Sequence, residues 1–320
     1  MKAVVTAEWT AAGHDRLAAL GYQVQAAGWG TTRRQLPPGE LVAIAADADL
    51  LVVEVEAVDA AVLAGLPALR LLGTARGTPS NVDIAACTLR GVPVLCTPAR
   101  NADSVADFVI GQILSLCRGI AAGERHLRDE GWLVGGELPY LHFRGPELSG
   151  LTLGLVGYGA VGRAVARRAG DGFGMRVAYF DPYVEGSVPL AELLAGSDVV
   201  SLHCSRGPAT DRLIGAAELA AMRPSAYLIN TAGGRVVDEA ALVDCLSRGG
   251  IAGAALDVFA AEPLPAGSLL RHLDNVLLTP HLAGAAWDVV RHHTDLLCDD
   301  IERWHQGVTP RRCANPEVLQ

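Results

Sequence analysis

The chain has 320 residues, of which half are apolar and 19% are charged, so it is long enough to form about two globular domains. Its formal net charge of -9 disfavours binding to nucleic acid or to anionic membranes, because phosphate groups attract basic surfaces. No apolar run reaches the roughly 18 to 20 residues of a membrane span. We therefore expect a cytoplasmic protein whose first residues, Met1–Thr6, form a strand rather than a signal peptide.

Apolar runs typical of buried strands alternate with helical segments through the first hundred residues. The runs are Val4-Val5, Leu50–Val53, Leu69–Gly73 and Val92–Leu95. Between them, the alanine-rich segments Leu41–Ala48 and Val58–Leu66 have helical periodicity. This alternation predicts a parallel sheet covered by helices.

The middle of the chain predicts a long helix and then an arm. Residues Ala102–Arg125 have a helical pattern, with Asn101 as a candidate cap. Seven glycines and prolines occur among the twenty residues of Gly131–Gly150, which favours an extended arm or linker.

A second alternation follows the arm, and it predicts a second doubly wound α/β domain. Its strands are expected at Leu151, Val177, Val199, Tyr227, Ala254 and Val276. A last helix, about Ala283–Gln306, is expected to cross back to the first domain. The predicted fold class is thus α/β, with two Rossmann-like parallel-sheet domains, of which the first is discontinuous.

The segment Gly157–Gly162 reads G-x-G-x-x-G, and it lies between a predicted strand and a predicted helix. In a dinucleotide-binding fold Gly157 permits a tight turn, Gly159 lets the backbone approach a pyrophosphate, and Gly162 lets the helix pack closely on the strand. The first turn of that helix offers free N–H groups to phosphates. Asp181 ends the next strand, where its carboxylate would bind the adenosine ribose and repel a 2′-phosphate. These features predict NAD rather than NADP, although glycines placed only for packing would leave the same pattern.

In an open parallel sheet, ligands bind outside the carboxyl ends of the strands. In the second domain the segments at these ends are Gly157–Gly162, Asp181, His203–Pro208, Asn230–Arg235, Asp257–Pro263 and Thr279–Gly284. Among them, Glu262 and His281 are a candidate acid/base couple, in which the carboxylate orients and charges the imidazole. Hydride transfer to a carbonyl needs such a proton donor.

With these residues in view, the chain resembles the D-isomer-specific 2-hydroxyacid dehydrogenases over nearly its whole length. The matching stretches are Arg76–Asp83, Thr97–Asp103, Gly157–Gly162 with Asp181, Ile229–Thr231, Val237–Leu242, Gly253–Phe259, Glu262-Pro263 and Thr279–His281. The resemblance implies a flavodoxin-like substrate domain (1–100 plus 289–320), an inserted NAD domain (101–288) and usually a homodimer. It also implies reduction of a small 2-oxo acid, or oxidation of the D-2-hydroxy acid, with NAD.

Carried over by position, the resemblance makes His281 the acid/base and Glu262 its partner. The cofactor contacts would be Gly157, Tyr158, Gly159, Ala160, Val161, Gly162, Asp181, Cys204, Thr231, Ala232, Gly233, Asp257, His281 and Gly284. The backbone of Arg76, Gly77 and Thr78 would hold the substrate carboxylate. No metal is expected, since the seven cysteines lack C-x-x-C spacing, and adjacent His292 and His293 lack the i, i+4 spacing of a zinc site.

One position departs from the family pattern, because Gly233 stands where the family has an arginine that clamps the substrate. A glycine cannot supply a forked guanidinium. Three interpretations remain open at this stage. Arg235 takes over the role; Arg76, Arg100 or Arg206 binds the anion from another wall, with an atypical or phosphonate-like substrate; or the protein binds NAD as a regulatory or scaffold protein with weak turnover.

Overall fold

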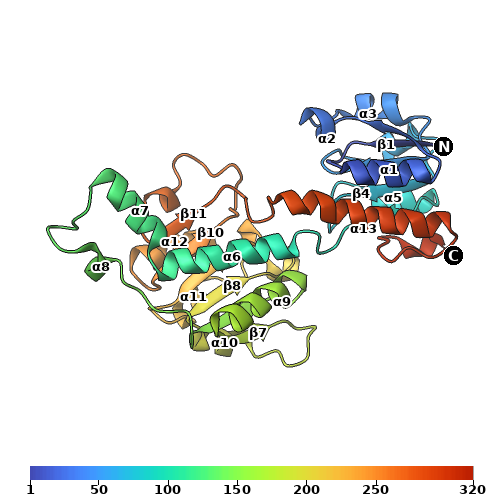
Figure 1. Ribbon diagram of the computed structural model, residues 1–320. Coiled ribbons are helices and arrows are strands. Elements are labelled where there is room, and N and C mark those ends of the chain that lie inside the picture. The colour runs from blue at the N-terminus through green and yellow to red at the C-terminus, as the bar shows by residue number, and fades with distance from the viewer. Residues whose placement is uncertain (320) are drawn as a thin grey trace. The chain divides into compact units, whose positions relative to one another are not determined.

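A computed structural model describes residues 1–319 of the chain. The residues form two compact units: unit 1 comprises Met1–Asn101 with the segment from Ala286 onward, and unit 2 comprises Ala102–Ala285. Each unit has its own parallel sheet with helices on both faces (Figure 1). The predicted fold class, two Rossmann-like α/β domains, is confirmed.

Unit 1 has a five-stranded parallel sheet in the order β2-β1-β3-β4-β5, the flavodoxin-like order. Its strands are β1 (Lys2–Val5), β2 (Gln23–Ala26), β3 (Leu50–Val53), β4 (Leu71–Thr74) and β5 (Val94–Leu95). Its helices are α1 (Ala11–Ala19), α2 (Trp29–Thr32), α3 (Pro38–Ala45), α4 (Ala60–Ala64), α5 (Ile84–Leu89) and α13 (Trp287–His305).

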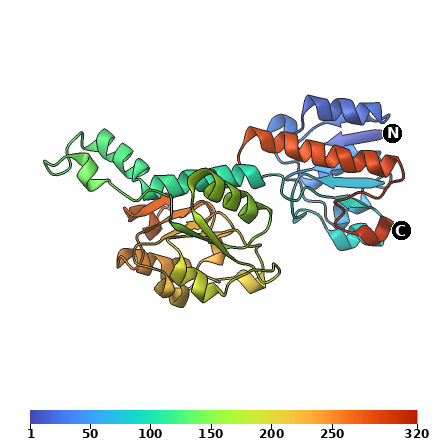
Figure 2. The same cartoon turned by 60° about the horizontal axis from the view of Figure 1, so that its bottom comes forward.

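The residues of β1, β3, β4 and β5 alternate between two hydrophobic cores in unit 1. One face, with Leu51 and Val53, packs on α3, α4 and α5. The other face, with Leu50 and Val52, packs on α1 and on Leu297 of α13. The chain's last helix therefore completes the core of the unit in which the chain begins, and both views show α13 along this unit (Figures 1 and 2).

Unit 2 has a six-stranded parallel sheet in the order β11-β10-β9-β8-β6-β7. Its strands are β6 (Thr152–Val156), β7 (Arg176–Phe180), β8 (Val199–Leu202), β9 (Tyr227–Asn230), β10 (Gly253–Leu256) and β11 (Val276–Leu278). Its helices are α6 (Ala102–Cys117), α7 (Ile120–Asp129), α8 (Pro139–His142), α9 (Ala160–Arg167), α10 (Leu190–Gly196), α11 (Ala216–Ala221) and α12 (Glu239–Ser247). The chain runs from β6 to β7 on one side and then to β8 on the other, so the strand order reverses between β6 and β8.

The same alternation builds two cores in unit 2. Leu153 and Leu155 face α6 and α9, whereas Val156 and Leu202 face α10, α11 and α12. Strands buried on both faces are continuous apolar runs, which is why the sequence identified them.

Three details differ from the expectations. Strand β2 was not predicted, because it is an edge strand whose mostly exposed residues form no apolar run. The predicted helix Ala102–Arg125 is two helices that meet at 61°, and Gly119 between them has the left-handed φ of 62°. The arm after them contains the short helix α8.

Among residues 1–319, no single helix has the length and apolar character of a membrane span; only the bent pair α6 and α7, taken together, passes those two criteria. The seven cysteines are free thiols. Within the described part of the chain, no three His, Cys, Asp or Glu side chains are grouped as metal ligands.

Candidate active site

The loops that follow β6 and β8 touch at the point where the strand order of unit 2 reverses. Gly157 has a φ of +96°, and a Cβ built there would lie 2.6 Å from the backbone nitrogen of Cys204. Any other residue would therefore be strained by both its backbone conformation and its contacts. The turn and its neighbouring loop define one edge of the candidate cofactor site.

The other two glycines of the fingerprint differ from each other in what surrounds them. A Cβ on Gly162 would lie 2.3 Å from the carbonyl oxygen of Gly157, so this glycine lets α9 pack against the turn. A Cβ on Gly159 would meet no protein atom within 4 Å. Packing in the protein does not explain a glycine at 159, whereas a ligand approaching the backbone does. The fingerprint thus fits a pyrophosphate.

Helix α9 begins at this open position, because Gly159 is its N-cap and provides no capping side chain. The N–H groups of the first turn, from Ala160 and Val161, therefore remain available to an anion. Beside them, the ring of Tyr158 stacks on that of Tyr179, with centroids 3.9 Å apart.

Asp181 lies directly beside the fingerprint. Its Oδ2 atom accepts a hydrogen bond of 2.8 Å from the Tyr158 N–H, and its Oδ1 atom accepts one of 3.0 Å from the Tyr183 N–H. These bonds fix a negative charge next to the turn at the end of β7, where the sequence predicted the ribose-binding carboxylate.

Two polar atoms near the ends of β8 and β9 are enclosed and have no hydrogen-bond partner among residues 1–319, namely Nδ1 of His203 and Oγ1 of Thr231. Nε2 of His203 lies 2.9 Å from the Ser201 hydroxyl. Burial lowers the pKa of His203 to about 3, so its ring is neutral at physiological pH. Burial likewise raises the pKa of the Cys204 thiol, which therefore stays protonated. Enclosed polar atoms without partners are rare in proteins, and a bound ligand is one way to satisfy them.

Asn230, the last residue of β9, holds the loop that carries Thr231, Ala232 and Gly233. Its Oδ1 atom accepts hydrogen bonds from the N–H groups of Ala232 and Gly233, and its Nδ2 atom donates one to the Gly233 carbonyl. The loop is therefore fixed by a side chain that comes from the buried strand.

His281 and Glu262 form a direct pair. Nδ1 of His281 lies 2.9 Å from Oε2 of Glu262, while the other carboxylate oxygen of Glu262 accepts the Phe259 N–H at 3.1 Å. Partial burial would raise the pKa of Glu262, but the hydrogen bonds from His281 and Phe259 and the charges of His281 and Arg206 together hold that pKa below its ordinary value. Glu262 is thus a carboxylate that orients the imidazole, and the free Nε2 atom remains available for proton transfer.

Asp257 positions the loop that carries His281. Oδ1 of this buried carboxylate accepts the Thr279 hydroxyl and the Leu282 N–H, and Oδ2 accepts the Ala283 N–H. The N–H of His281 donates to the carbonyl of Asp257. His281 has a φ of 56°, which is uncommon for a residue other than glycine. Asp257 therefore maintains a strained conformation at the candidate catalytic residue, and half-buried Gly284 follows in the same segment.

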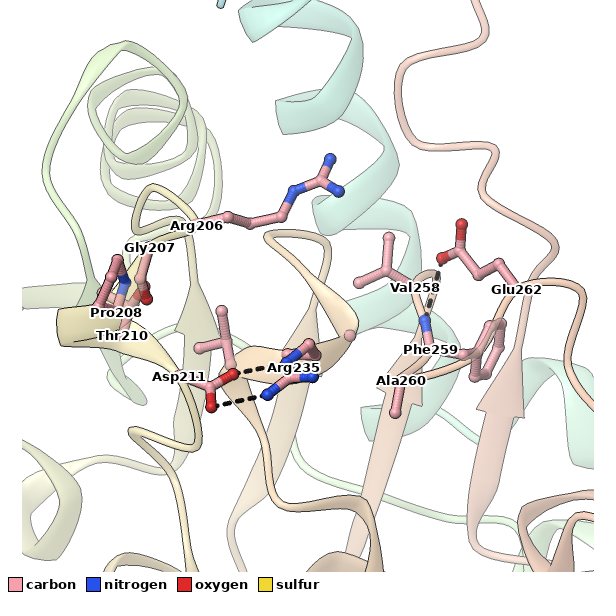
Figure 3. A pocket seen from close by; sticks show the side chains of 12 residues that line it. Arg206, Gly207, Pro208, Thr210, Asp211, Arg235, Val258, Phe259, Ala260 and Glu262 are labelled. Carbon is pink, nitrogen blue, oxygen red and sulfur yellow. Dashed lines mark hydrogen bonds and ion pairs between the residues drawn. The ribbon is translucent and has the colours of Figure 1, made fainter. Parts of the chain in front are cut away.

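A pocket of about 690 Å³ opens between the loops after β8, β9 and β10 (Figure 3). Residues that line it are Arg206, Gly207, Pro208, Thr210, Asp211, Gly234, Arg235, Val236, Val258, Phe259, Ala260 and Glu262. The lining includes one member of the candidate acid/base pair, Glu262, and two of the four arginines that the sequence offered as candidate substrate clamps, Arg206 and Arg235.

These two arginines have different environments. Arg235 donates two hydrogen bonds to the carboxylate of Asp211, at 2.7 and 3.0 Å, and its side chain is 73% exposed. Arg206 has no hydrogen bond or ion pair with any residue from 1 to 319, and its side chain extends toward the Glu262 side of the pocket (Figure 3).

The other candidates belong to unit 1, where Arg76, Gly77, Thr78 and Arg100 lie in the loops after β4 and β5. Arg76 donates to the Glu54 carbonyl and to the Ser80 hydroxyl. Arg100 forms an ion pair of 3.2 Å with Glu54 and lies 2.8 Å from Nδ1 of His293. Both guanidinium groups are therefore engaged within their own unit.

Sequence reasoning gave no role to Asn230 and treated Asp257 only as a cofactor contact. Both are single polar residues directly after buried apolar runs, and that position was the available signal. A Cβ built on Gly233 would lie 2.7 Å from Cγ of Arg206. This proximity had no such signal, because the two residues lie 27 positions apart and on different loops.

Comparison with known proteins agrees with this geometry. The family model described as D-isomer specific 2-hydroxyacid dehydrogenase, NAD binding domain, matches residues 110–283. A glyoxylate reductase of Korarchaeum cryptofilum (strain OPF8) is 36% identical over 298 residues, which cover 89% of this chain and 89% of that protein. A glycerate dehydrogenase of Methylorubrum extorquens is 36% identical over 273 residues, covering 84% of this chain and 87% of that protein.

Among solved structures, the TT0316 protein from Thermus thermophilus is 34% identical, with a TM-score of 0.83, and the match covers 98% of this chain and 100% of that one. Sequence, fold and site agree on one assignment: the chain belongs to the D-isomer-specific 2-hydroxyacid dehydrogenases, a family of NAD-dependent oxidoreductases that act on CH–OH groups.

Proposed function

We propose that the protein reduces a small 2-oxo acid to the D-2-hydroxy acid with NADH, and catalyses the reverse oxidation with NAD. The observation that carries the proposal is the pair His281–Glu262, 2.9 Å apart, in the same unit as an open dinucleotide fingerprint. Bound NADH would supply the hydride from C4 of its nicotinamide ring.

His281 supplies the proton, and Glu262 and Asp257 position its ring. Nε2 of His281 donates a proton to the oxygen of the substrate carbonyl, and in the reverse direction it accepts that proton from the hydroxyl. Glu262 holds the ring through Nδ1 and stabilises the charged imidazole. Asp257 fixes the loop from which the ring projects.

The chain also contains the residues that would hold the cofactor. The open backbone at Gly159 and the first turn of α9 would hold the pyrophosphate, and Asp181 would accept hydrogen bonds from the ribose hydroxyls. The negative charge of Asp181 disfavours the 2′-phosphate of NADP.

For the substrate, the names of two relatives indicate small molecules. The similar proteins from Korarchaeum and Methylorubrum are named glyoxylate reductase and glycerate dehydrogenase. Glyoxylate and hydroxypyruvate, the 2-oxo acid that corresponds to glycerate, are therefore the first substrates to test. The predicted role of the Arg76–Thr78 backbone in holding the carboxylate remains a prediction.

The test is the consumption of NADH, followed by absorbance, with a panel of 2-oxo acids that includes glyoxylate, hydroxypyruvate, larger 2-oxo acids and phosphonate analogues. We expect saturable turnover with at least one small 2-oxo acid and a D-configured product. NADH binding without turnover on the whole panel would reject the proposal and would favour a regulatory role.

We also propose that the protein is a homodimer that uses the segment from α7 through the arm. Exposed apolar side chains gather there, including Trp132 (67% exposed) and Tyr140 (66%), and large exposed apolar groups commonly mark protein interfaces. Sedimentation should give twice the chain mass of 33.4 kDa. A monomer at micromolar concentration would reject this assignment. The cytoplasmic location and the absence of nucleic-acid and membrane partners remain predictions.

A further inference from the structure

We propose that Arg206 binds the anionic 2-oxo acid next to His281, and that position 233 must be glycine because the Arg206 side chain occupies the space beside it. This inference rests on the proposed function and identifies the residue that recognises the substrate. Three observations support this proposal. They concern the space beside Gly233, the absence of an ion-pair partner for Arg206 among the described residues, and the effect of the Arg206 charge on Glu262.

The first observation is steric. Arg206 lies in the loop after β8 and Gly233 in the loop after β9, and these two strands are neighbours in the sheet. A Cβ on Gly233 would lie 2.7 Å from Cγ and 2.9 Å from Cδ of Arg206. Gly233 has a φ of -176°, which any residue can adopt. Its backbone conformation therefore does not require glycine, whereas the stem of Arg206 fills the volume where a side chain would begin.

The second observation is that the Arg206 guanidinium is free. Most arginines near this pocket are neutralised, as Arg235 is by Asp211 and Arg212 is by Asp238 at 3.7 Å. In contrast, no described residue forms a hydrogen bond or ion pair with Arg206, which extends across the pocket toward Glu262 (Figure 3). A cation with five donors and no protein partner is suited to an anionic ligand.

The third observation is where this charge acts. Arg206 is the charge outside the pair whose field reaches Glu262 and favours its ionised form. A substrate placed at Nε2 of His281 therefore lies within the field of the same guanidinium. The long side chain brings a forked donor to the acid/base pair although its backbone belongs to another loop.

The chemistry needs such a group at two points. A 2-oxo acid is an anion, so its carboxylate needs a counter-charge on binding. When the carbonyl carbon receives the hydride, the π electron pair moves to the carbonyl oxygen, and that oxygen takes the proton from His281. Arg206 donates hydrogen bonds to the carboxylate and to this oxygen while its negative charge develops, and it forms no covalent bond.

The test compares Arg206→Ala, Arg206→Lys and the control Arg248→Ala, which removes a surface arginine paired with Asp244. We expect Arg206→Ala to lower kcat/KM by roughly 10²- to 10³-fold, Arg206→Lys to lower it less, and the control to leave it unchanged. Affinity for NADH, measured by tryptophan fluorescence, should not change in any of the three.

A second readout does not need turnover. Oxalate, a small dicarboxylate with the shape of a 2-oxo acid, should bind the wild-type NADH complex and should bind the Arg206→Ala complex at least tenfold more weakly, as measured by calorimetry. If Arg206→Ala keeps kcat/KM and oxalate affinity within threefold of wild type, the assignment is wrong even though the proposed function stands. If no 2-oxo acid is turned over but oxalate binding still depends on Arg206, the proposed function fails and Arg206 remains an anion site.

The role of Gly233 is tested by a double-mutant cycle. Gly233→Ala should displace the Arg206 side chain and lower kcat/KM by at least tenfold with little change in Tm, because only a flexible side chain has to move. The same substitution in the Arg206→Ala background should have almost no further effect. Equal losses in both backgrounds would show that Gly233 acts independently of Arg206, and this part of the proposal would be wrong.

Discussion

The two units build the same kind of sheet, but the charged groups at the carboxyl ends of their strands are used differently. In unit 1, Arg76 and Arg100 are both engaged with Glu54, and Arg100 also contacts the buried His293. In unit 2, Arg206 has no partner among residues 1–319, and the pair His281–Glu262 is half exposed. Arg76 and Arg100 stabilise the loops of unit 1, whereas Arg206 and the pair His281–Glu262 in unit 2 are available to a ligand.

This difference shows why an arginine in a strand-end loop is weak evidence for an anion site. All four candidate arginines follow strands or lie close to their ends, and the sequence did not rank them by partner. The charge of a guanidinium that already has a carboxylate partner is largely neutralised, which weakens its attraction for an anionic substrate. We therefore expect substitution of Arg206 or His281 in unit 2 to affect catalysis first and substitution of Arg100 in unit 1 to affect stability first.

The largest expected effect is that of His281→Ala. Loss of the proton donor should lower kcat by about 10²- to 10⁴-fold, with little change in NADH affinity or in Tm, because the side chain is exposed and its only partner is Glu262. Steady-state kinetics measure kcat, and fluorescence titration measures the affinity for NADH. Glu262→Gln should lose less, since a neutral side chain still positions the ring. Full activity of His281→Ala would contradict the assignment of the proton donor.

The next effect separates two glycines of the fingerprint. Gly157→Ala should lower the free energy of unfolding by about 1 to 3 kcal/mol, because its φ of +96° and the close backbone of Cys204 both exclude a side chain. The matched variant Gly159→Ala should keep its stability and bind NADH more weakly, since its Cβ meets no protein atom. Urea unfolding measures the stability of both variants, and titration with NADH measures their affinity for the cofactor. If the two variants behave alike in both measurements, the open position is not a cofactor contact.

A third substitution examines unit 1. Arg100→Ala removes one partner each from Glu54 and His293, whose side chains keep only their hydrogen bonds with Glu8, at a site where the arginine is only 21% exposed. We expect a loss of roughly 1 to 3 kcal/mol in the free energy of unfolding. The control Arg34→Ala breaks an exposed surface pair with Glu40 and should leave the free energy of unfolding nearly unchanged. Unchanged stability of Arg100→Ala together with a hundredfold lower kcat/KM would reverse the comparison between the units.

The smallest effect concerns the half-buried imidazole of His203 in unit 2. The folded-state pKa of His203 is lowered to about 3, so between its ordinary value and pH 3 the unfolded chain binds a proton that the folded chain does not. The free energy of unfolding must therefore fall as the pH drops below about 6.5. His203 contributes up to roughly 1.4 kcal/mol per pH unit to this fall. In His203→Gln, the difference in unfolding free energy between pH 7 and pH 5 should shrink by about 1 to 2 kcal/mol. An unchanged pH dependence would mean that the ring is protonated in the folded state.

The parts of the fold that could be predicted share one property, namely that their signal is local in the sequence. Strands buried on both faces, such as β3 and β8, are uninterrupted apolar runs. The edge strand β2 was missed because its residues face solvent, and the break at Gly119 was missed because one left-handed residue leaves the helical pattern on both sides intact. In the candidate site, Glu262 and His281 were found because each follows a strand of the same parallel sheet, and the structure brings them within a hydrogen bond.

By itself, the sequence determined the two doubly wound domains, the family, the NAD fingerprint and the candidate acid/base pair, because each is specified by contiguous residues or by the ends of parallel strands. Only the tertiary structure distinguished Arg206 from Arg235. That distinction depends on which carboxylate each guanidinium meets and on the space beside Gly233, and both are properties of neighbouring loops that no local spacing encodes. The glycine at position 233 therefore acquires a physical reason only when the side chain of Arg206, which fills the space beside it, is seen.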